Sequence, residues 1–407
     1  MRDSSYDNAG VEALRLVSGL IDRYGPRLSG TESCRAAAEE LEGRLSAVCD
    51  EVHLESFDLH PGSLFVVGKV FALSYSVGCL SLFLPRPGIS AAVGLLALLL
   101  GAAFCLAQFV LYLDVFDPLF RKIAGRNIVG RIEPSGPATK QILIVAHHDS
   151  APIYPFHERL AALFPLRLFA PIALYALLLL ACFAAFLAAL VGGAAIMPLW
   201  GKIAFALGLA FVTPMYGYFS KRGSPGAGDN LSGCAICARI AGLFGGDSPR
   251  LGRTRLRVLL SDGEEAGQKG SMRFAREHLE EMRSLPTTVI NIDTVYRVED
   301  LGLLERDRNG MTPLSAELAR RLQAIAAERG RAMRILSIPF GGGGTDGAQF
   351  ARAGIETASV IGMPTAATRK EILIHTTRDL PDRIEAEALG AVIETVSEYI
   401  AREDGYY

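Results

Sequence analysis

Five short polar segments of this 407-residue chain carry histidine or acidic side chains directly after predicted strands or at the start of predicted helices. They are residues 146–150, 226–233, 259–267, 291–294 and 374–379. Imidazole and carboxylate groups bind zinc, and a carboxylate that binds no metal can transfer protons. Because the carboxyl ends of the strands in an open α/β sheet form one binding edge, we expect these side chains to converge there.

In the first segment, His147 ends a predicted strand at residues 141–147, and Asp149 follows two residues later. Side chains alternate across a strand, so His147 and Asp149 share a face and His148 points away. Asp149 is then placed to accept a hydrogen bond from the second ring nitrogen of His147, which metal-bound imidazoles usually need. Taken alone, a His near an Asp at a strand end is more often an ordinary surface pair than a metal ligand.

The other four segments add carboxylates and a second imidazole. Their candidate metal-binding or proton-transferring residues are Asp229 in a glycine-rich turn before a helix, Glu264 and Glu265 after a buried strand, Asp293 at the end of an apolar strand, and His375 in a late loop. Taken singly, they fit helix caps, an acidic helix N-terminus and a solvated loop histidine. Together with the first segment they supply two imidazoles, three carboxylates and a spare glutamate. That set suits two zinc ions that share one carboxylate.

The order and local sequences of these segments resemble those of the zinc exopeptidases of peptidase family M28. Relatives include bacterial leucyl aminopeptidases, glutamate carboxypeptidase II and glutaminyl cyclases. The shared motifs are His-x-Asp at 147–149, Asp-Asn-x-Ser-Gly at 229–233, Glu-Glu-x-Gly at 264–267, Asp-Thr at 293–294 and His-Thr-x-x-Asp at 375–379. Residues 25–30 and 344–350 also fit the family.

The resemblance implies a two-zinc enzyme with the phosphorylase/hydrolase-like fold of zinc exopeptidases. It implies that Asp229 bridges the zinc ions, that Glu264 is the general base and that Asp149 orients His147. The implied zinc ligands are His147, Asp229, Glu265, Asp293 and His375. It also implies a cis peptide bond between Asp229 and Asn230, which is unusual because Asn230 is not proline.

The chain departs from the family pattern in two places. His147 and Asp229 are 82 positions apart (229 − 147), far more than the family's usual short loop, and an apolar insertion fills the gap. Position 347 is Gly where some relatives carry a bulkier residue, which puts the shape of the substrate pocket in doubt.

Two long apolar blocks interrupt the soluble pattern. In the first, residues 64–85 carry one charge, Lys69, and residues 89–113 carry none; in the second, residues 168–193 carry none and residues 196–219 carry only Lys202. Each run reaches the ~20 apolar residues that a bilayer-spanning helix needs. The blocks therefore predict two transmembrane hairpins, with a pair of very apolar core helices as the alternative.

Outside these blocks, strand patterns alternate with amphipathic helical patterns. Strands are predicted at 52–59, 127–132, 141–147, 256–260, 288–292 and 357–361, and helices at 7–24, 31–45, 271–282, 313–328 and 381–400. This alternation predicts an α/β fold with a mixed, largely parallel central sheet flanked by helices. The predicted peptidase domain combines residues 1–62, 114–163 and 221–407, and the hairpins lie at 63–113 and 164–220.

The net charge of the chain and the distribution of its basic residues indicate which partners and which membrane orientation to expect. The net charge is −2 at pH 7, so no nucleic-acid partner is expected, because such proteins present basic surfaces. The hairpin tips carry only Arg86 and Lys202, whereas more basic residues flank the soluble side: Arg121, Lys122, Arg126, Arg159, Arg167, Lys221 and Arg222. The positive-inside rule then predicts an integral protein of the plasma or inner membrane, with four spans and a cytoplasmic catalytic side.

The sequence thus predicts a membrane-anchored exopeptidase, specifically an aminopeptidase, whose partners are a peptide with a free N-terminus and the lipid bilayer. Two zinc ions would lower the pKa of a bound water, and Glu264 would accept its proton and return it to the leaving amine. Among enzymes, a glutaminyl cyclase or another amidohydrolase on the same fold is the alternative. A non-catalytic receptor or scaffold is the alternative outside them, although such relatives typically lose ligands that this chain keeps.

Overall fold

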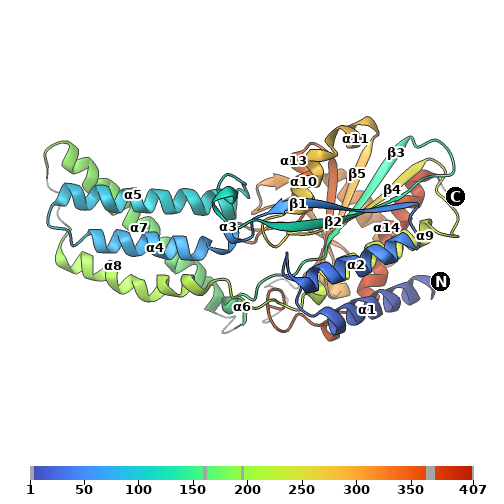
Figure 1. Cartoon of the computed structure of the whole chain (residues 1–407), viewed down its shortest axis with the longest axis horizontal. Helices are drawn as coiled ribbons and strands as arrows, with labels where there is room; N and C mark the ends of the chain where they lie inside the picture. Colours follow the sequence, from blue (N-terminus) through green and yellow to red (C-terminus); the bar gives the residue numbers. More distant parts are fainter. Residues whose placement is uncertain (1–3, 159–162, 194–196, 364–371, 406–407) are drawn as a thin grey trace. The chain divides into compact units, whose positions relative to one another are not determined.

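The computed structural model describes residues 4–158, 163–193, 197–363 and 372–405, so Arg159 lies outside the described residues. The chain forms two compact units (Figure 1). Unit 1 consists of Met1–Pro61, Lys122–Ile153 and Arg222–Tyr407, and unit 2 consists of Gly62–Arg121 and Tyr154–Lys221.

A nine-stranded sheet forms the centre of the described part of unit 1. Its order is β1 (Glu51–Leu59), β2 (Ile123–Ile132), β4 (Thr254–Ser261), β3 (Lys140–His147), β5 (Thr287–Val295), β9 (Glu356–Gly362), β6 (Gly302–Asp307) and β7 (Thr312–Pro313), and β8 (Arg334–Ser337) pairs with β6. The middle strands β4, β3, β5 and β9 are parallel. On both sides, β2 and β6 pair with them in the antiparallel direction. The predicted mixed α/β sheet is confirmed, and its parallel part is the centre.

Helices cover both faces of this sheet (Figure 1). One face carries α1 (Ser4–Tyr24), α2 (Glu32–Ser46), α9 (Ser232–Phe244), α12 (Ala316–Glu328) and α14 (Ala386–Asp404). The other carries α10 (Lys269–Glu277), α11 (Leu279–Ser284) and α13 (Gly347–Arg352). Strand β3 is buried between the layers: Ile142 and Ile144 pack with the first set, and Leu143 and Val145 pack with the second. Full burial of each such side chain contributes about 1.5–3 kcal/mol.

Three predicted helices differ from the observed ones. The predicted helix at 271–282 is two helices, α10 and α11, separated at His278. The helix predicted from 313 begins at Ala316, because the Ser315 side chain caps it by accepting the Leu318 N–H. The helix predicted from 381 begins with the short 3-10 turn η7 (Pro381–Arg383), and α14 follows.

Unit 2 contains four long apolar helices: α4 (Val67–Ser81), α5 (Pro87–Cys105), α7 (Phe164–Leu190) and α8 (Leu199–Val212). With their flanking turns they form four segments, Gly62–Ser81, Pro87–Val110, Phe164–Leu190 and Leu199–Gly217, that are long and apolar enough to cross a membrane by length and composition. The shorter elements are α3 (Gly62–Phe65), η1 (Leu106–Val110), η2 (Asp117–Leu119), α6 (Pro155–Glu158) and η4 (Thr213–Gly217).

Buried polar contacts join the helices of unit 2 to one another. Tyr175 Oη of α7 donates to the carbonyl of Leu98 in α5 at 2.6 Å. Tyr75 Oη of α4 donates to the carbonyl of Phe205 in α8 at 3.0 Å. Hydrogen bonds between helices fix which faces of apolar helices meet, because apolar packing alone is not directional.

Candidate metal centre and active site

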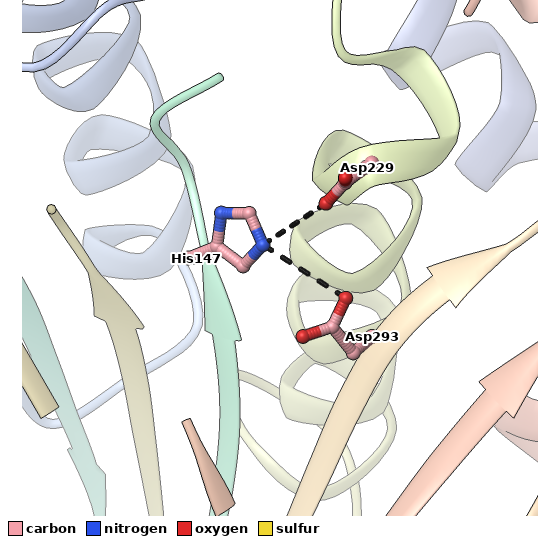
Figure 2. A group of neighbouring side chains, drawn as sticks. All are labelled: His147, Asp229 and Asp293. Carbon is pink, nitrogen blue, oxygen red and sulfur yellow. Dashed lines mark ion pairs between the residues drawn. The ribbon is translucent and has the colours of Figure 1, made fainter. Parts of the chain in front are cut away.

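His147 is the last residue of β3, and its imidazole points into a group of carboxylates (Figure 2). The ring is 1% exposed, and Nε2 lies 3.2 Å from Oδ1 of Asp229 and 3.9 Å from Oδ1 of Asp293. Because β3 and β5 are neighbouring parallel strands, their carboxyl ends bring His147 and Asp293 to the same edge of the sheet.

Asp229 lies between the two imidazoles of the site. Its Oδ1 faces Nε2 of His147 at 3.2 Å, and its Oδ2 faces Nε2 of His375 at 3.1 Å. Nε2 of His375 also lies 3.4 Å from Oε2 of Glu265. The two oxygens of the Asp229 carboxylate therefore contact two separate groups of side chains, one around His147 and one around His375.

These contacts define clusters of possible metal-binding side chains among the described residues, within which the ligand atoms lie within 4.8 Å of one another. One comprises His147, Asp229 and Asp293, and another comprises Asp229, Glu265 and His375. A third joins Glu264 and Glu265 to His147. All six of these side chains, which come from five separate segments of the sequence, thus converge at one site in unit 1.

Close packing of ionisable groups shifts their pKa values in opposite directions. Burial opposes the charge of Asp229, but the hydrogen bonds and charges of His147 and His375 outweigh it and lower the pKa of Asp229 below its usual range. Burial likewise opposes the charge of His375, but the charge of Glu265 and the contact with Asp229 raise the pKa of His375 to about 10. Burial raises the pKa of Glu265 to about 7 and the pKa of Glu264 well above its usual range. The carboxylates repel one another, and a bound cation would relieve that repulsion.

The donor set fits zinc, whose usual ligands are imidazole nitrogen and carboxylate oxygen. Among the described residues, Oε1 of Glu265 is buried and has no hydrogen-bond partner. Buried polar atoms are nearly always hydrogen-bonded, so such atoms need an explanation. A metal ion held by these side chains would provide it.

Comparison with known sequences points to the same chemistry. Residues 214–400 match the model of the family described as Peptidase family M28. The resemblance predicted from the motifs is thereby confirmed, and it associates the chain with metal-dependent hydrolases. Of the seven predicted site residues, only His147 and Asp149 precede the matched range.

Solved structures share the fold of this chain. A glutaminyl cyclase of Porphyromonas gingivalis is 16% identical, with a TM-score of 0.58 over 97% of this chain and 98% of that one. A Zn-dependent exopeptidase from Parabacteroides distasonis is 15% identical, with a TM-score of 0.55 over 96% and 97%. A leucine aminopeptidase precursor from Bacteroides thetaiotaomicron is 16% identical, with a TM-score of 0.53 over 96% and 95%. The search of curated proteins gave no match.

Side chains to which the motifs assign no role hold the Asp229 loop of the site. The Asp379 carboxylate accepts hydrogen bonds from the backbone N–H groups of Gly228 and Asp229 at 2.7 and 3.2 Å. Oδ1 of Asn230 accepts from the N–H of Thr294 at 3.2 Å, which ties the loop to the end of β5. The bond between Asp229 and Asn230 is cis, as predicted. The signal for Asp379 in the sequence is its fixed place in the His-Thr-x-x-Asp motif.

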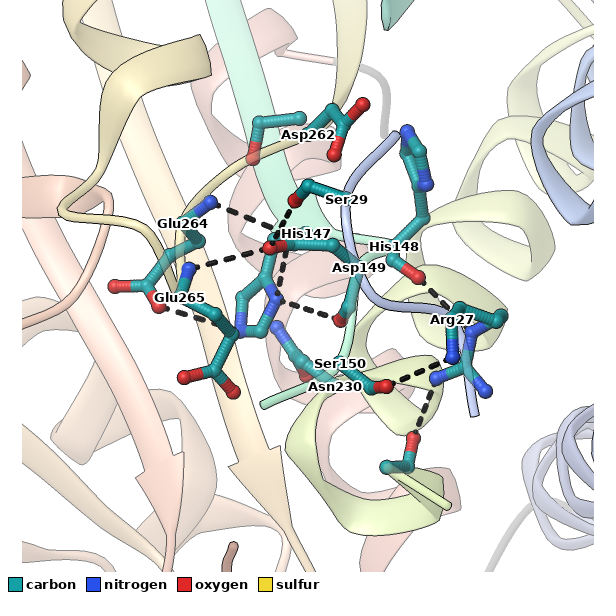
Figure 3. A network of polar contacts seen from close by, with 12 residues as sticks. Arg27, Ser29, His147, His148, Asp149, Ser150, Asn230, Asp262, Glu264 and Glu265 are labelled. Atoms are coloured by element: carbon teal, nitrogen blue, oxygen red, sulfur yellow. Dashed lines mark hydrogen bonds and ion pairs between the residues drawn. The ribbon is translucent and has the colours of Figure 1, made fainter. Parts of the chain in front are cut away.

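Asp149 is fully buried and acts on more than His147 (Figure 3). Its carboxylate accepts from the backbone N–H groups of Glu264 and Glu265, both at 3.2 Å, and from Ser29 Oγ at 3.0 Å. Nδ1 of His147 lies 3.2 Å from the backbone oxygen of Asp149 and 3.4 Å from its Oδ1. Burial opposes the charge of Asp149, but the bond and charge of His147 outweigh it and lower the pKa of Asp149. Asp149 thus fixes the turn that carries both glutamates.

Gly347, the second departure from the family pattern, is a close-packing position at the start of α13. A Cβ added there would lie 2.3 Å from Oγ of Ser359 and 3.2 Å from Cβ of Asn291. A bulkier residue at 347 would have to displace these side chains of β9 and β5. The glycine therefore permits α13 to approach the sheet.

Proposed function

We propose that this chain is a membrane-anchored exopeptidase, specifically an aminopeptidase, that uses two zinc ions to hydrolyse peptide bonds. The observation that carries the proposal is the position of Asp229, whose two carboxylate oxygens face His147 and His375 at 3.2 and 3.1 Å. One carboxylate shared by two ligand groups is the arrangement that a two-metal hydrolase needs.

The ligands divide into two groups. His147, Asp229 and Asp293 would hold one zinc ion, and Asp229, Glu265 and His375 would hold the other. When bound, zinc lowers the pKa of a water molecule and polarises the substrate carbonyl. Asp149 orients the imidazole of the first group and, through the backbone, positions Glu265 of the second.

Glu264 is the proposed proton carrier. Its carboxylate is nearly buried, and Oε2 lies 4.0 Å from Nε2 of His147. The Glu264 carboxylate is therefore next to the proposed zinc ligands. Burial raises the pKa of Glu264, which favours holding a proton between two steps. Glu264 takes a proton from the attacking water as the water oxygen bonds to the carbonyl carbon of the substrate. It then delivers that proton to the amine nitrogen as the C–N bond breaks.

The choice of an aminopeptidase is supported by the structural similarity to the leucine aminopeptidase precursor of Bacteroides thetaiotaomicron and the Zn-dependent exopeptidase of Parabacteroides distasonis. The site gathers four carboxylates, from Asp229, Glu264, Glu265 and Asp293, around two imidazoles, and two Zn²⁺ ions would balance the four negative charges. A free α-amine of the substrate near one of the metals would make the proposed enzyme an exopeptidase.

The two predicted hairpins, residues 63–113 and 164–220, are the proposed membrane anchor, and the peptidase part is proposed to lie on the cytoplasmic side. The length and hydropathy of the four apolar helices support this arrangement. The charges flanking the spans support the orientation, because more basic residues flank the soluble side than the tips.

The test is metal analysis of the purified protein combined with a panel of aminoacyl amides. We expect about two zinc per chain, hydrolysis that stops on chelation and returns with zinc, and no hydrolysis of the N-acetylated amides. Equal hydrolysis of free and acetylated substrates would contradict aminopeptidase activity.

A second candidate is a glutaminyl cyclase, which is favoured by the structural similarity to the Porphyromonas gingivalis enzyme at a TM-score of 0.58. The two reactions differ in products. On a peptide with N-terminal glutamine, an aminopeptidase releases free glutamine, whereas a cyclase releases ammonia and leaves the peptide bonds intact. Mass spectrometry of the product decides between them, and a chain inactive on every substrate would favour a scaffold role.

A further inference from the structure

Arg27 is a fully buried arginine in the loop between α1 and α2, and its guanidinium donates to backbone carbonyls (Figure 3). Nε donates to the carbonyl of His148 at 3.0 Å. One terminal nitrogen donates to Gly25 and Pro225, both at 2.8 Å, and the other donates to Gly226 at 2.9 Å. Four of the five N–H donors of a guanidinium are thus used. A buried charge is tolerated only when it is satisfied in this way.

The carbonyls of His148, Pro225 and Gly226 belong to the two chain segments that lead to site residues, and the carbonyl of Gly25 belongs to the loop of Arg27 itself. His148 lies between His147 and Asp149, and Gly226 lies three residues before Asp229. Between the segments, residues 154–221 belong to unit 2. A single side chain of unit 1 therefore bonds both ends of the insertion where they leave and re-enter that unit.

Other hydrogen bonds also join these two segments, and the Cys234 thiol donates to the His147 carbonyl at 3.1 Å. The N–H of Ile153 donates to the Arg222 carbonyl, and the N–H of Ser224 donates to the Ala151 carbonyl, both at 2.8 Å. A pairing this short is marginally stable by itself. The backbone of Arg27 adds two bonds to Ser150: its N–H donates to Oγ at 2.8 Å, and its carbonyl accepts the Ser150 N–H at 3.0 Å.

Gly226 shows how tightly the guanidinium fits. Its φ is +68°, and a Cβ added there would lie 2.9 Å from Nη2 of Arg27 and 2.7 Å from the carbonyl oxygen of Asp229. Any side chain at 226 would therefore crowd the Asp229 backbone and Ser150 as well as the guanidinium. Gly330 has a similar φ of +71° with nothing within 4 Å of the added Cβ, so it is a matched control for backbone strain.

We propose that Arg27 is a positioning residue that clasps the two ends of the inserted membrane hairpin and so keeps His147 and Asp229 at ligand distance. The proposal rests on the proposed zinc-dependent function of the site. It assigns the buried charge a task that lysine cannot fully take over, because an ammonium group lacks the planar fork that reaches four carbonyls.

The test measures zinc affinity in the full-length protein by competition with a chromophoric chelator, together with amide hydrogen exchange. We expect Arg27→Ala to bind zinc at least tenfold more weakly and to exchange faster at residues 151–153 and 222–229. Added guanidinium should restore affinity to Arg27→Ala, whereas methylammonium should not. Arg27→Lys should lie between the two. Gly226→Ala should weaken zinc binding, and Gly330→Ala should leave it unchanged.

Wild-type zinc affinity in both Arg27→Ala and Gly226→Ala would overturn the proposal. So would faster exchange throughout unit 1 without rescue by guanidinium, because that pattern indicates a general folding role. If Arg27→Ala does not fold, the zinc affinities of Arg27→Lys and Gly226→Ala still test the proposal. If the wild-type protein binds no zinc, the proposed function fails, and unchanged exchange at 151–153 and 222–229 would separately refute the clasp.

Discussion

The carboxylate of Asp379 accepts a hydrogen bond from the backbone N–H of Asp229, a residue 150 positions earlier in the chain. Together with the bond from the N–H of Gly228, this contact fixes the loop that aims Asp229 at both imidazoles. Hydrogen bonds to charged groups contribute about 1.5–3 kcal/mol. We therefore expect Asp379→Ala to weaken zinc binding about tenfold or more. Asp382→Ala, at an exposed position nearby, is the control, and equal zinc affinity in the two variants would contradict this role.

The motif residues converge because each follows a strand or enters a helix at the carboxyl edge of the sheet, a position that the sequence pattern reveals. His147 and Asp293 end neighbouring strands, and both were predictable. The role of Arg27 was not, because its partners are backbone carbonyls, which leave no trace in residue types. Strands β6 and β8 and helix α13 were missed because they are short and their burial depends on tertiary contacts.

Glu264 and Glu265 are adjacent, yet their substitution should give different outcomes. We expect Glu264→Gln to keep its zinc and lose about 10²–10⁴ of the hydrolysis rate, since proton transfer is lost while the ligands remain. Glu265→Gln should lose zinc, because Glu265 belongs to the group around His375. Metal analysis and initial rates of both variants check the assignment. Normal turnover in zinc-loaded Glu264→Gln would place the base elsewhere.

The glycine at 101 in α5 accommodates the tyrosine contact inside unit 2. A Cβ there would lie 2.1 Å from Oγ of Ser74 and 2.6 Å from Oη of Tyr175. We expect Gly101→Ala to destabilise the detergent-solubilised protein by about 1–3 kcal/mol, the usual cost of overpacking. Thermal unfolding measures the change. Gly217→Ala, where nothing lies within 4 Å of the added Cβ, should have little effect; equal destabilisation by both would refute the close fit.

The pH dependence of stability should reflect the pair formed by His278 and Glu55. Nε2 of His278 lies 2.9 Å from Oε1 of Glu55, and this hydrogen bond raises the pKa of the imidazole despite its partial burial. Glu281 and His53 also contact the pair, and Arg257 opposes the positive charge. A raised folded-state pKa stabilises the protein below the unfolded value of about 6.5 and ceases to do so as pH rises through the folded value.

For Glu55 the sign is reversed. Burial opposes its charge, but the two histidines lower the pKa of Glu55, so its contribution disappears as pH falls through the folded value. We expect the difference in melting temperature between wild type and Glu55→Gln to be largest between about pH 5 and 6.5 and to shrink at alkaline pH. A difference that grows between pH 7 and 9 would contradict the pairing. Glu51→Gln, on the same strand, is the control.

The topology prediction tests the charge rule at the two hairpins. The tips carry Arg86 and Lys202, whereas basic residues that include Arg121, Arg167 and Lys221 flank the soluble side. Translocating a loop rich in lysine and arginine is unfavourable, so the soluble side should stay in the cytoplasm. Reporter fusions after Pro87 and after Ala195 should then behave as periplasmic or exoplasmic, and a fusion at the C-terminus should behave as cytoplasmic. The reverse pattern would refute the orientation. Cytoplasmic behaviour at all three positions would show that the hairpins do not cross the bilayer, in which case the four apolar helices would need another partner to cover them.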